Sequence, residues 1–401
     1  MSTILVVAVL SLLLGLQPIT TDLYLPALPA LSVGLSAGMA QAQLTLSALL
    51  LAFGASQLIW GPLSDRFGRR PILLTGLFIY VVASAAGALA HNINWLIIWR
   101  TAQGAALGAA VMCARAILRD LYAPADGARV MSQALSGLAL FACISAPLGS
   151  FLTEHLGWRY ALLAPSVFGA AGMALIMWRF EESLAPAARR TVSFKALSAN
   201  WMAIFRNPSF WAFSSLTVTS YAGLFTFLAT SSFVFTGVLG VTNTQYGLIM
   251  LSNSLAYLSG TFLCRRWLAR FGLRGAVARA GILSLTGGSV MAMLSISGVI
   301  GVWAILLPQY LFMIGHGIHQ PCGQSGVVGP FPHAAGVASA LNGFLMMAGA
   351  FAMGHWLGIH MDGTVAPLTL GVWFWSVLIA LSAWTLVQHH GDPIVQVASR
   401  A

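Results

Sequence analysis

Apolar stretches of about 20 residues follow one another along almost the whole chain, and short polar segments separate them. A helix needs this length to cross the hydrocarbon core of a bilayer. The pattern predicts twelve membrane spans, with the ranges 4–28, 43–63, 71–90, 94–115, 130–152, 160–180, 209–235, 245–264, 276–297, 300–321, 335–358 and 367–387. An even number of spans places both ends of the chain on the same side of the membrane.

The overall composition agrees with this pattern. The chain is 58% hydrophobic and only 7% charged, whereas a soluble domain carries about 25% charged residues. Because so few charges cannot cover a water-facing surface, the bilayer must be the solvent for most of the chain. We therefore expect an all-α membrane protein without a large soluble domain.

The net charge of +10 indicates how the chain is oriented. The loops after even-numbered spans and the middle of the chain hold most basic residues: Arg66, Arg69, Arg70, Arg115, Arg119, Arg129, Arg179, Arg189, Arg190, Lys195, Arg206, Arg265, Arg266, Arg270, Arg274 and Arg279. The opposite loops hold only Arg159. By the positive-inside rule, the basic loops and both termini are cytoplasmic. No aromatic platform accompanies the basic residues, so we do not expect a nucleic acid partner.

The chain divides into two halves around a hydrophilic segment. We expect one half at 1–180, a cytoplasmic linker at 181–207 with an amphipathic surface helix around Phe194–Phe205, and a second half at 208–401. The segment "DRFGRR" that begins at Asp65 is echoed by "ARFGLR" at Ala269, 204 residues later. Two parallel six-helix repeats would give this echo, with a binding site between them at the bilayer midplane.

Asp22 is the only acidic residue that the pattern places inside a span. A carboxylate in a cavity of low dielectric can bind and release a proton, and this role is the one we favour. The alternative is that Asp22 caps a helix end at the outer interface, where Pro26 ends the span. Arg100 is the other charge near the membrane core. The alternative to a functional role is that its side chain extends from a helix end to the membrane interface.

The segment "GPLSDRFGRRP" (Gly61–Pro71) predicts a tight turn between two helices. Gly61 and Gly68 allow close approach of the backbone. Asp65 ends the second span and can face the positive N-terminus of another helix. The remaining basic positions hold the loop on the cytoplasmic side, and they are Arg66, Arg69 and Arg70.

This segment resembles motif A of the major facilitator superfamily. "WRTAQGAALGAA" (Trp99–Ala110) resembles motif B, and "ISAPLGSFL" (Ile144–Leu152) resembles the antiporter motif C, although Ala146 and Ser150 stand where glycine is often found. "TTDLYLPALP", "RDLY" (Arg119–Tyr122) and "GPFPHAAGVASALNG" (Gly329–Gly343) narrow the resemblance to the Bcr/CflA subfamily of drug:proton antiporters.

The resemblance implies twelve helices in two six-helix halves that rock between inward-open and outward-open states. It implies export of small, mostly apolar drugs across the bacterial inner membrane, driven by proton entry, with Asp22 and Arg100 in proton coupling. The latch between the halves would contain Gly61, Asp65, Arg66, Gly68, Arg69, Arg70 and Asp120, and motif C would act through Ala146, Pro147 and Gly149. We expect a monomer in the lipid bilayer that needs no cofactor and has small molecules and protons as partners.

Polar and aromatic residues within spans are candidates for the substrate cavity, because such side chains usually face protein. They are Gln17, Tyr24, Gln57, Tyr221, Phe225, Thr226 and Asn253. A dedicated transporter of a nucleoside or an amino acid derivative remains an alternative function.

Three further functions are weighed against transport driven by protons. His316 and His319 have the spacing of a metal pair on one helix face, so a membrane enzyme that also used His355 as a metal ligand is an alternative. The absence of a GxxxxGK[ST] motif disfavours an ATP-driven pump. Asp22 and the intact Gly61–Pro71 segment disfavour a sensor that has lost transport.

Overall fold

Helices joined by short turns make up the fold, and no β-strand occurs among the described residues. The computed structural model describes residues 2–122, 124–185, 189, 194–331 and 334–391. The chain forms two compact units. Unit 1 comprises Met1–Val192, Phe235–Leu251 and Gly354–Met361, and unit 2 comprises Ser193–Val234, Ser252–Met353 and Asp362–Ala401. The first boundary, after Val192, falls inside the predicted linker.

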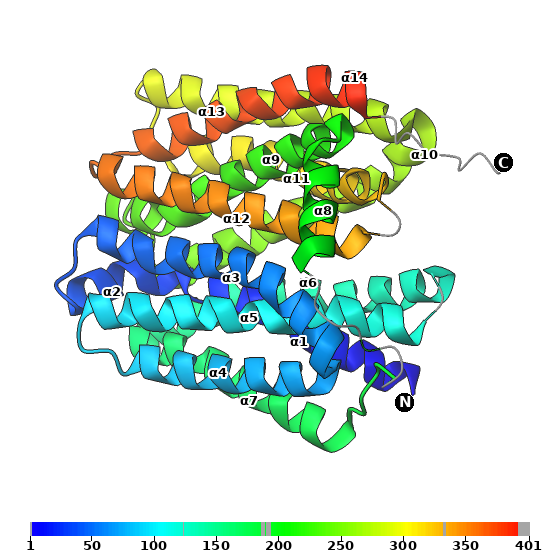
Figure 1. The fold of residues 1–401 in the computed structure, drawn as a ribbon. Coiled ribbons are helices and arrows are strands. Elements are labelled where there is room, and N and C mark those ends of the chain that lie inside the picture. The colour runs from blue at the N-terminus through cyan, green and yellow to red at the C-terminus, as the bar shows by residue number, and fades with distance from the viewer. Residues whose placement is uncertain (1, 123, 186–188, 190–193, 332–333, 392–401) are drawn as a thin grey trace. The chain divides into compact units, whose positions relative to one another are not determined.

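Unit 1 is a bundle of long helices, coloured blue to green in Figure 1. Its helices are α1 (Thr3–Thr21), η1 (Leu25–Ala27), α2 (Leu28–Gly34), α3 (Met39–Phe67), α4 (Arg69–Ala88), α5 (Ile93–Leu121), α6 (Pro124–His155) and α7 (Trp158–Arg179). Helix α5 packs on α1, α3 and α4. Small residues allow this approach, since a Cβ at Gly104 would collide with the Leu49 carbonyl on α3.

Unit 1 also contains the first residues of α10 and the last residues of α12. Gly247 on α10 packs against Pro147 and Ser150 of α6. Glu154 Oε2, near the end of α6, accepts hydrogen bonds from the Thr244 amide at 3.1 Å and the Thr244 hydroxyl at 2.6 Å. This carboxylate therefore lies at the positive N-terminus of α10.

Unit 2 contains the remaining helices. They are α8 (Phe194–Phe205), α9 (Pro208–Ser232), most of α10 (Asn243–Ile296), α11 (Val302–Val328), most of α12 (Ala335–His360), α13 (Ala366–Leu381), η4 (Ser382–Leu386) and α14 (Val387–His390). The π-helical segment η3 (Phe233–Val238) follows α9, and from Phe235 onward it belongs to unit 1. Helix α9 packs on α11 and α13. Helix α8 has the same bounds as the predicted surface helix.

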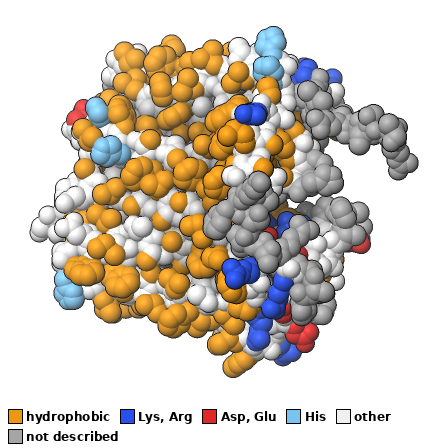
Figure 2. All heavy atoms as spheres, in the orientation of Figure 1, with side chains coloured by type: hydrophobic (Ala, Val, Ile, Leu, Met, Phe, Trp, Pro, Cys, Tyr) orange, Lys and Arg blue, Asp and Glu red, His pale blue; other side chains and the backbone are white. Residues whose placement is uncertain are grey.

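Ten helices in the described part of the chain are long and apolar enough to cross a membrane. Helix α10 is one of them, and its 54 residues include two predicted spans. Helix α11 is absent from the ten because histidine and glutamine lower its hydropathy. Counting both parts of α10 and adding α11 gives the twelve predicted spans. Large apolar side chains such as Phe78, Val167 and Met293 are exposed, and Figure 2 shows mainly hydrophobic side chains on the visible face.

The structure repeats the internal echo of the sequence at two glycines. Gly68 separates α3 from α4 with φ 102° and ψ 162°. Gly272 interrupts α10 with φ 66° and ψ −176°. Only glycine adopts this backbone conformation readily, so both turns need glycine at this position. The two glycines are 204 residues apart, which is the offset of the echo.

Several helices extend beyond the predicted spans. Helix α3 continues to Phe67, α5 continues to Leu121, and α6 already begins at Pro124. The added turns carry charged residues, including Arg66 and Asp120. Hydropathy marks the part of a helix that lies in hydrocarbon, and a helix does not have to end where the hydrocarbon ends.

Candidate functional site

Asp22 lies where helix α1 breaks. The Asp22 amide donates to the Pro18 carbonyl at 2.8 Å and closes the last turn of α1, and the short helix η1 follows at Leu25. Pro26 has no amide hydrogen and cannot donate to the Asp22 carbonyl four residues earlier, so the helix cannot continue unchanged. The break is therefore built into the sequence "TDLYLP".

The Asp22 carboxylate is half-buried, and the neighbouring Thr21 hydroxyl donates to its Oδ1 atom at 2.8 Å. The ion pairs found among the described residues do not include Asp22. The structure thus places Asp22 at a helix break within the first membrane segment, and both predicted roles, proton exchange and helix capping, start from this position.

Arg100 on α5 is 1% exposed and binds the broken end of α1. Its NH2 group donates to the Thr20 carbonyl at 3.2 Å, and its NH1 group donates to Gln103 Oε1 at 2.7 Å. The guanidinium also lies 4.0 Å from the centre of the Tyr24 ring. A cation at a helix C-terminus is stabilised by the carbonyl dipoles, so Arg100 acts as a cap for α1.

Polar side chains of α1, α3, α4 and α5 surround this cap. Gln103 Nε2 donates to the Ser84 hydroxyl at 2.7 Å, and the Ser84 hydroxyl donates to the Tyr80 carbonyl at 2.6 Å. The Tyr80 hydroxyl pairs with the Thr20 hydroxyl at 2.6 Å. Tyr24, one of the cavity candidates, pairs through its hydroxyl with Thr45 on α3 at 2.5 Å. We call this set, with Arg100, the Arg100 network.

The antiporter motif on α6 packs directly against the same break. A Cβ at Gly149 would collide with the carbonyl of Leu23, the residue after Asp22. Ala146 is buried, and Pro147 contacts Gly247 of α10. The motif C positions therefore touch the broken end of α1 on one side and α10 on the other.

A second polar cluster joins the ends of α3, α4 and α5. Arg69 is 2% exposed, and its NH1 group contacts Asp65 Oδ1 at 2.5 Å. Its Nε and NH2 groups donate to the two oxygens of Asp120 at 2.8 and 3.4 Å. The Ser64 hydroxyl accepts a further bond at 2.7 Å. Two carboxylates thus neutralise one buried guanidinium, as pairing of a buried charge requires.

Glu182 completes this cluster from the segment after α7. Its carboxylate accepts hydrogen bonds from the amides of Arg69 at 2.8 Å, Arg70 at 3.2 Å and Leu184 at 3.0 Å. An anion at the N-terminus of a helix is favourable because the helix dipole is positive there. We call Asp65, Arg69, Asp120 and Glu182 the motif A cluster.

The other predicted latch residues lie around this cluster. Arg70 donates to the Met177 carbonyl at 2.9 Å, and Gly68 forms the turn itself. Arg66 is exposed and lies beside the Phe67 ring, and Gly61 faces the Met112 side chain. The cluster brings Asp65, Arg69 and Asp120 together but leaves Arg66 outside.

The remaining cavity candidates have varied surroundings. In unit 1, Gln17 is half-buried, and Gln57 is buried and donates to the Phe53 carbonyl at 3.3 Å. In unit 2, Phe225, Thr226 and Asn253 are buried and Tyr221 is half-buried. Their place in a cavity stays a prediction.

The histidines of the alternative metal site have other neighbours. His316 Nδ1 pairs with the Ser220 hydroxyl at 2.8 Å, and its ring stacks on Phe312. His319 is fully buried, and His355 is exposed. Within the described ranges, no three His, Cys, Asp or Glu side chains gather as they would around a metal ion.

Sequence reasoning missed several members of both clusters. Thr20, Tyr80 and Ser84 were not singled out, although a buried polar side chain in an apolar helix is a usable signal. Glu182 was placed only in a cytoplasmic loop. Two of its three partners are backbone amides more than one hundred residues away, and a sequence pattern gives no sign of them.

Comparison with known proteins identifies the family. The family model of the Major Facilitator Superfamily matches residues 10–354. Multidrug resistance protein D of Escherichia coli strain K12 is 28% identical over 393 residues, covering 96% of this chain and 97% of that protein. The bicyclomycin resistance protein homolog of Haemophilus influenzae is 23% identical over 385 residues, covering 96% of each.

Among solved structures, the inward open conformation of the Escherichia coli xylose transporter XylE covers 100% of this chain and 98% of its own, with a TM-score of 0.75. At 13% sequence identity this likeness concerns the fold alone. It confirms the predicted all-α, twelve-helix fold class, and the family match confirms the superfamily that motifs A, B and C indicated. The chain belongs to the Major Facilitator Superfamily.

Proposed function

We propose that this protein exports small, mostly apolar drugs or related compounds in exchange for protons, by alternating access. Two relatives named for multidrug and bicyclomycin resistance support the proposal, because each is similar along nearly the whole chain. The structural observation that carries it is the break in α1. There the Asp22 carboxylate has no ion-pair partner among the described residues, and the buried Arg100 bonds the Thr20 carbonyl two residues before it.

Asp22 is the proposed proton carrier. A carboxylate inside a membrane segment is costly and usually serves a function. Arg100 does not neutralise it through an ion pair but bonds the Thr20 carbonyl and Gln103. The charge of Asp22 can therefore be cancelled by a proton or by a cationic or hydrogen-bonding substrate, and competition between these two couples their fluxes.

Arg100 is the proposed positioning residue for this carboxylate. Its hydrogen bond to the Thr20 carbonyl fixes α1 two residues before Asp22, and its contact with the Tyr24 ring fixes the chain two residues after Asp22. The break thereby keeps a defined geometry when Asp22 gains or loses a proton.

Motif C is the proposed connection between proton exchange and helix movement. Gly149 lets α6 touch the backbone at Leu23, so a change of backbone conformation at Asp22 meets α6 directly. Pro147 interrupts the hydrogen bonding of α6 and favours bending at this level.

The motif A cluster is the proposed cytoplasmic latch. Arg69 and Glu182 join α3, α4 and α5 to the start of the linker. A cluster of charges at such a junction can be rearranged without opening an apolar core. We propose that it is made and broken as the transporter changes state, with Gly61, Arg66 and Arg70 in supporting positions.

The substrate is proposed to contact Gln17, Gln57, Tyr221, Phe225, Thr226 and Asn253. The aromatic and apolar members suit an apolar compound, and the amides supply a few oriented hydrogen bonds. Tyr24 is better assigned to the Arg100 network, because its ring and its hydroxyl are both occupied.

The chain crosses the membrane many times. We further propose the bacterial inner membrane as its location, both termini in the cytoplasm, and a monomer as the transporting unit. The distribution of arginines supports this orientation.

A resistance assay tests the function. Wild type and Asp22→Asn are expressed at matched membrane levels in a bacterial host without its own efflux pumps. Growth is measured against phenicols, bicyclomycin, sulfonamides, fluoroquinolones and lipophilic cations. We expect resistance to at least one class with wild type and none with Asp22→Asn.

Asp362→Asn is the matched control, because Asp362 is exposed between α12 and α13 and an asparagine oxygen can still accept from Thr364. This variant should keep wild-type resistance. Resistance from Asp22→Asn equal to that of wild type would contradict the role of Asp22. If wild type gives no resistance to any class, the proposed drug export is wrong and a dedicated metabolite transporter is favoured.

A further inference from the structure

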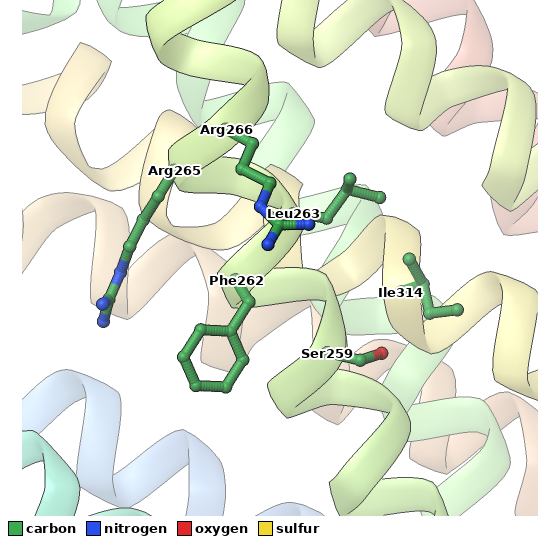
Figure 3. Close-up of a pocket in the computed structure, with 6 residues that line it drawn as sticks. All are labelled: Ser259, Phe262, Leu263, Arg265, Arg266 and Ile314. Atoms are coloured by element: carbon green, nitrogen blue, oxygen red, sulfur yellow. The ribbon is translucent and has the colours of Figure 1, made fainter.

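A groove lies on unit 2 between α10 and α11. It has a volume of about 480 Å³ and is lined by Ser259, Phe262, Leu263, Arg265, Arg266 and Ile314. Figure 3 shows Arg266 extending toward the space among Phe262, Ser259 and Ile314, and Arg265 lying on the other side of Phe262. The two helices touch closely at its floor, because a Cβ at Gly260 would collide with the Ile314 carbonyl.

Arg265 and Arg266 take part in none of the ion pairs found among the described residues. The only carboxylates in the sequence of unit 2 are Asp362 and Asp392, against eight arginines and lysines. Asp362 follows α12, at the end of the unit opposite the Gly272 turn to which Arg265 and Arg266 are close. The described part of the unit therefore offers these exposed guanidinium groups no carboxylate at this end, and an anion from outside the unit can pair with them.

An exposed apolar surface runs along α10 toward the two arginines. Leu255 and Phe262, seven residues apart on one helix face, are 52% and 56% exposed. Asn253, on a different face of the same helix, is 2% exposed. In a membrane segment an exposed apolar face is solvated by acyl chains, so the groove begins in hydrocarbon and ends at two cations.

We propose that this groove binds an anionic phospholipid of the phosphatidylglycerol type. Its phosphodiester lies between Arg265 and Arg266, with the Ser259 hydroxyl at the edge, and one acyl chain follows Phe262 and Leu255. Arginine suits this role because its planar guanidinium donates two hydrogen bonds to one phosphate. Basic pockets between membrane helices on the cytoplasmic side bind anionic headgroups in this manner.

The apolar surface distinguishes a lipid from a soluble phosphate compound. A soluble phosphodiester would gain only the contacts with arginine, whereas a lipid also covers Phe262. Arg265 lies 5.5 Å from the Phe262 ring centre, so the ring holds one cation beside the path of the chain.

Native mass spectrometry of the purified, delipidated protein in a neutral detergent tests this inference. Phosphatidylglycerol and phosphatidylcholine are titrated separately into wild type, Arg266→Gln and the double variant R265Q/R266Q. We expect phosphatidylglycerol to bind more tightly than phosphatidylcholine. Each lost arginine should weaken binding about fivefold, as expected for about 1 kcal/mol per basic residue at the membrane surface.

Arg206→Gln is the matched control, since it removes one exposed arginine of the same unit away from the groove. It should bind phosphatidylglycerol like wild type. Phe262→Ala should weaken binding while both cations remain. All variants should keep the melting temperature and monodispersity of wild type without lipid.

Three results would overturn the inference. They are equal affinity for the two lipids, equal affinity of Arg266→Gln and Arg206→Gln, and displacement of the lipid by soluble glycerophosphoglycerol at a similar concentration. The last result would show that the arginines bind phosphate without using the apolar surface.

Discussion

Replacing Arg100 should destabilise unit 1 by an amount that its contacts allow us to estimate. Arg100→Met keeps most of the apolar volume and removes the bonds to Thr20 and Gln103 and the contact with Tyr24. The bond to Thr20 joins two membrane helices and contributes about 0.6 kcal/mol, the bond to Gln103 within α5 contributes about 0.2–0.5 kcal/mol, and a buried cation–π contact contributes about 2 kcal/mol. The expected loss is about 3 kcal/mol of unfolding free energy.

Two further variants separate the parts of this estimate. Arg100→Lys should recover only part of the loss, because an ammonium group cannot bond both oxygens in the planar geometry of a guanidinium. Tyr24→Phe keeps the ring and should cost little, whereas Tyr24→Leu removes the cation–π contact and should cost about 2 kcal/mol more.

Equilibrium unfolding by sodium dodecyl sulfate in mixed micelles measures these changes. Arg159→Met is the control, because Arg159 is exposed, stacks on Trp158 at 4.2 Å and bonds a single carbonyl. Arg159→Met should lower the unfolding free energy by only about 0.5–1 kcal/mol, the contribution of an exposed cation–π contact. Arg100 is not the cap of α1 if Arg100→Met costs no more than this control, or if Arg100→Lys is as unstable as Arg100→Met.

Three other variants test motif C and the motif A cluster. Gly149→Val should cost about 1–3 kcal/mol of stability and abolish transport, because the added Cβ meets the Leu23 backbone. The control Gly237→Ala, whose Cβ meets no atom within 4 Å, should be neutral when both variants are compared by thermal shift and efflux. Glu182→Ala should lower thermal stability by about 2 kcal/mol through the lost amide bonds, and the exposed Glu181→Ala should not; equal effects would contradict the cap. Asp65→Asn should slow transport but leave substrate binding intact, and lost binding in a folded protein would show a different role for Asp65.

The fold followed from the sequence where hydropathy and glycine determine it. Twelve apolar runs and the asymmetry of arginines are properties of the residues themselves. The same holds for Gly68 and Gly272, since their backbone angles exclude other residues, and for α8, whose amphipathic pattern lies between polar neighbours. The motifs A, B and C added the family.

The partners of the site residues did not follow in this way. Arg100 caps a backbone carbonyl, Glu182 caps backbone amides, and Gly149 touches the Leu23 carbonyl. Backbone groups are the same at every position, so no residue pattern marks which of them a distant side chain will reach. The sequence shows that Pro26 ends the first span, but it does not show that Arg100 bonds the carbonyl left free at the end of α1.

In the proposed mechanism, proton and substrate compete for Asp22. Purified protein in weakly buffered detergent solution, adjusted to neutral pH, receives a compound that wild type exports, and a pH indicator dye records released protons. We expect proton release from wild type and from Asp362→Asn, and no release from Asp22→Asn. Undiminished proton release from Asp22→Asn, with substrate bound, would contradict it.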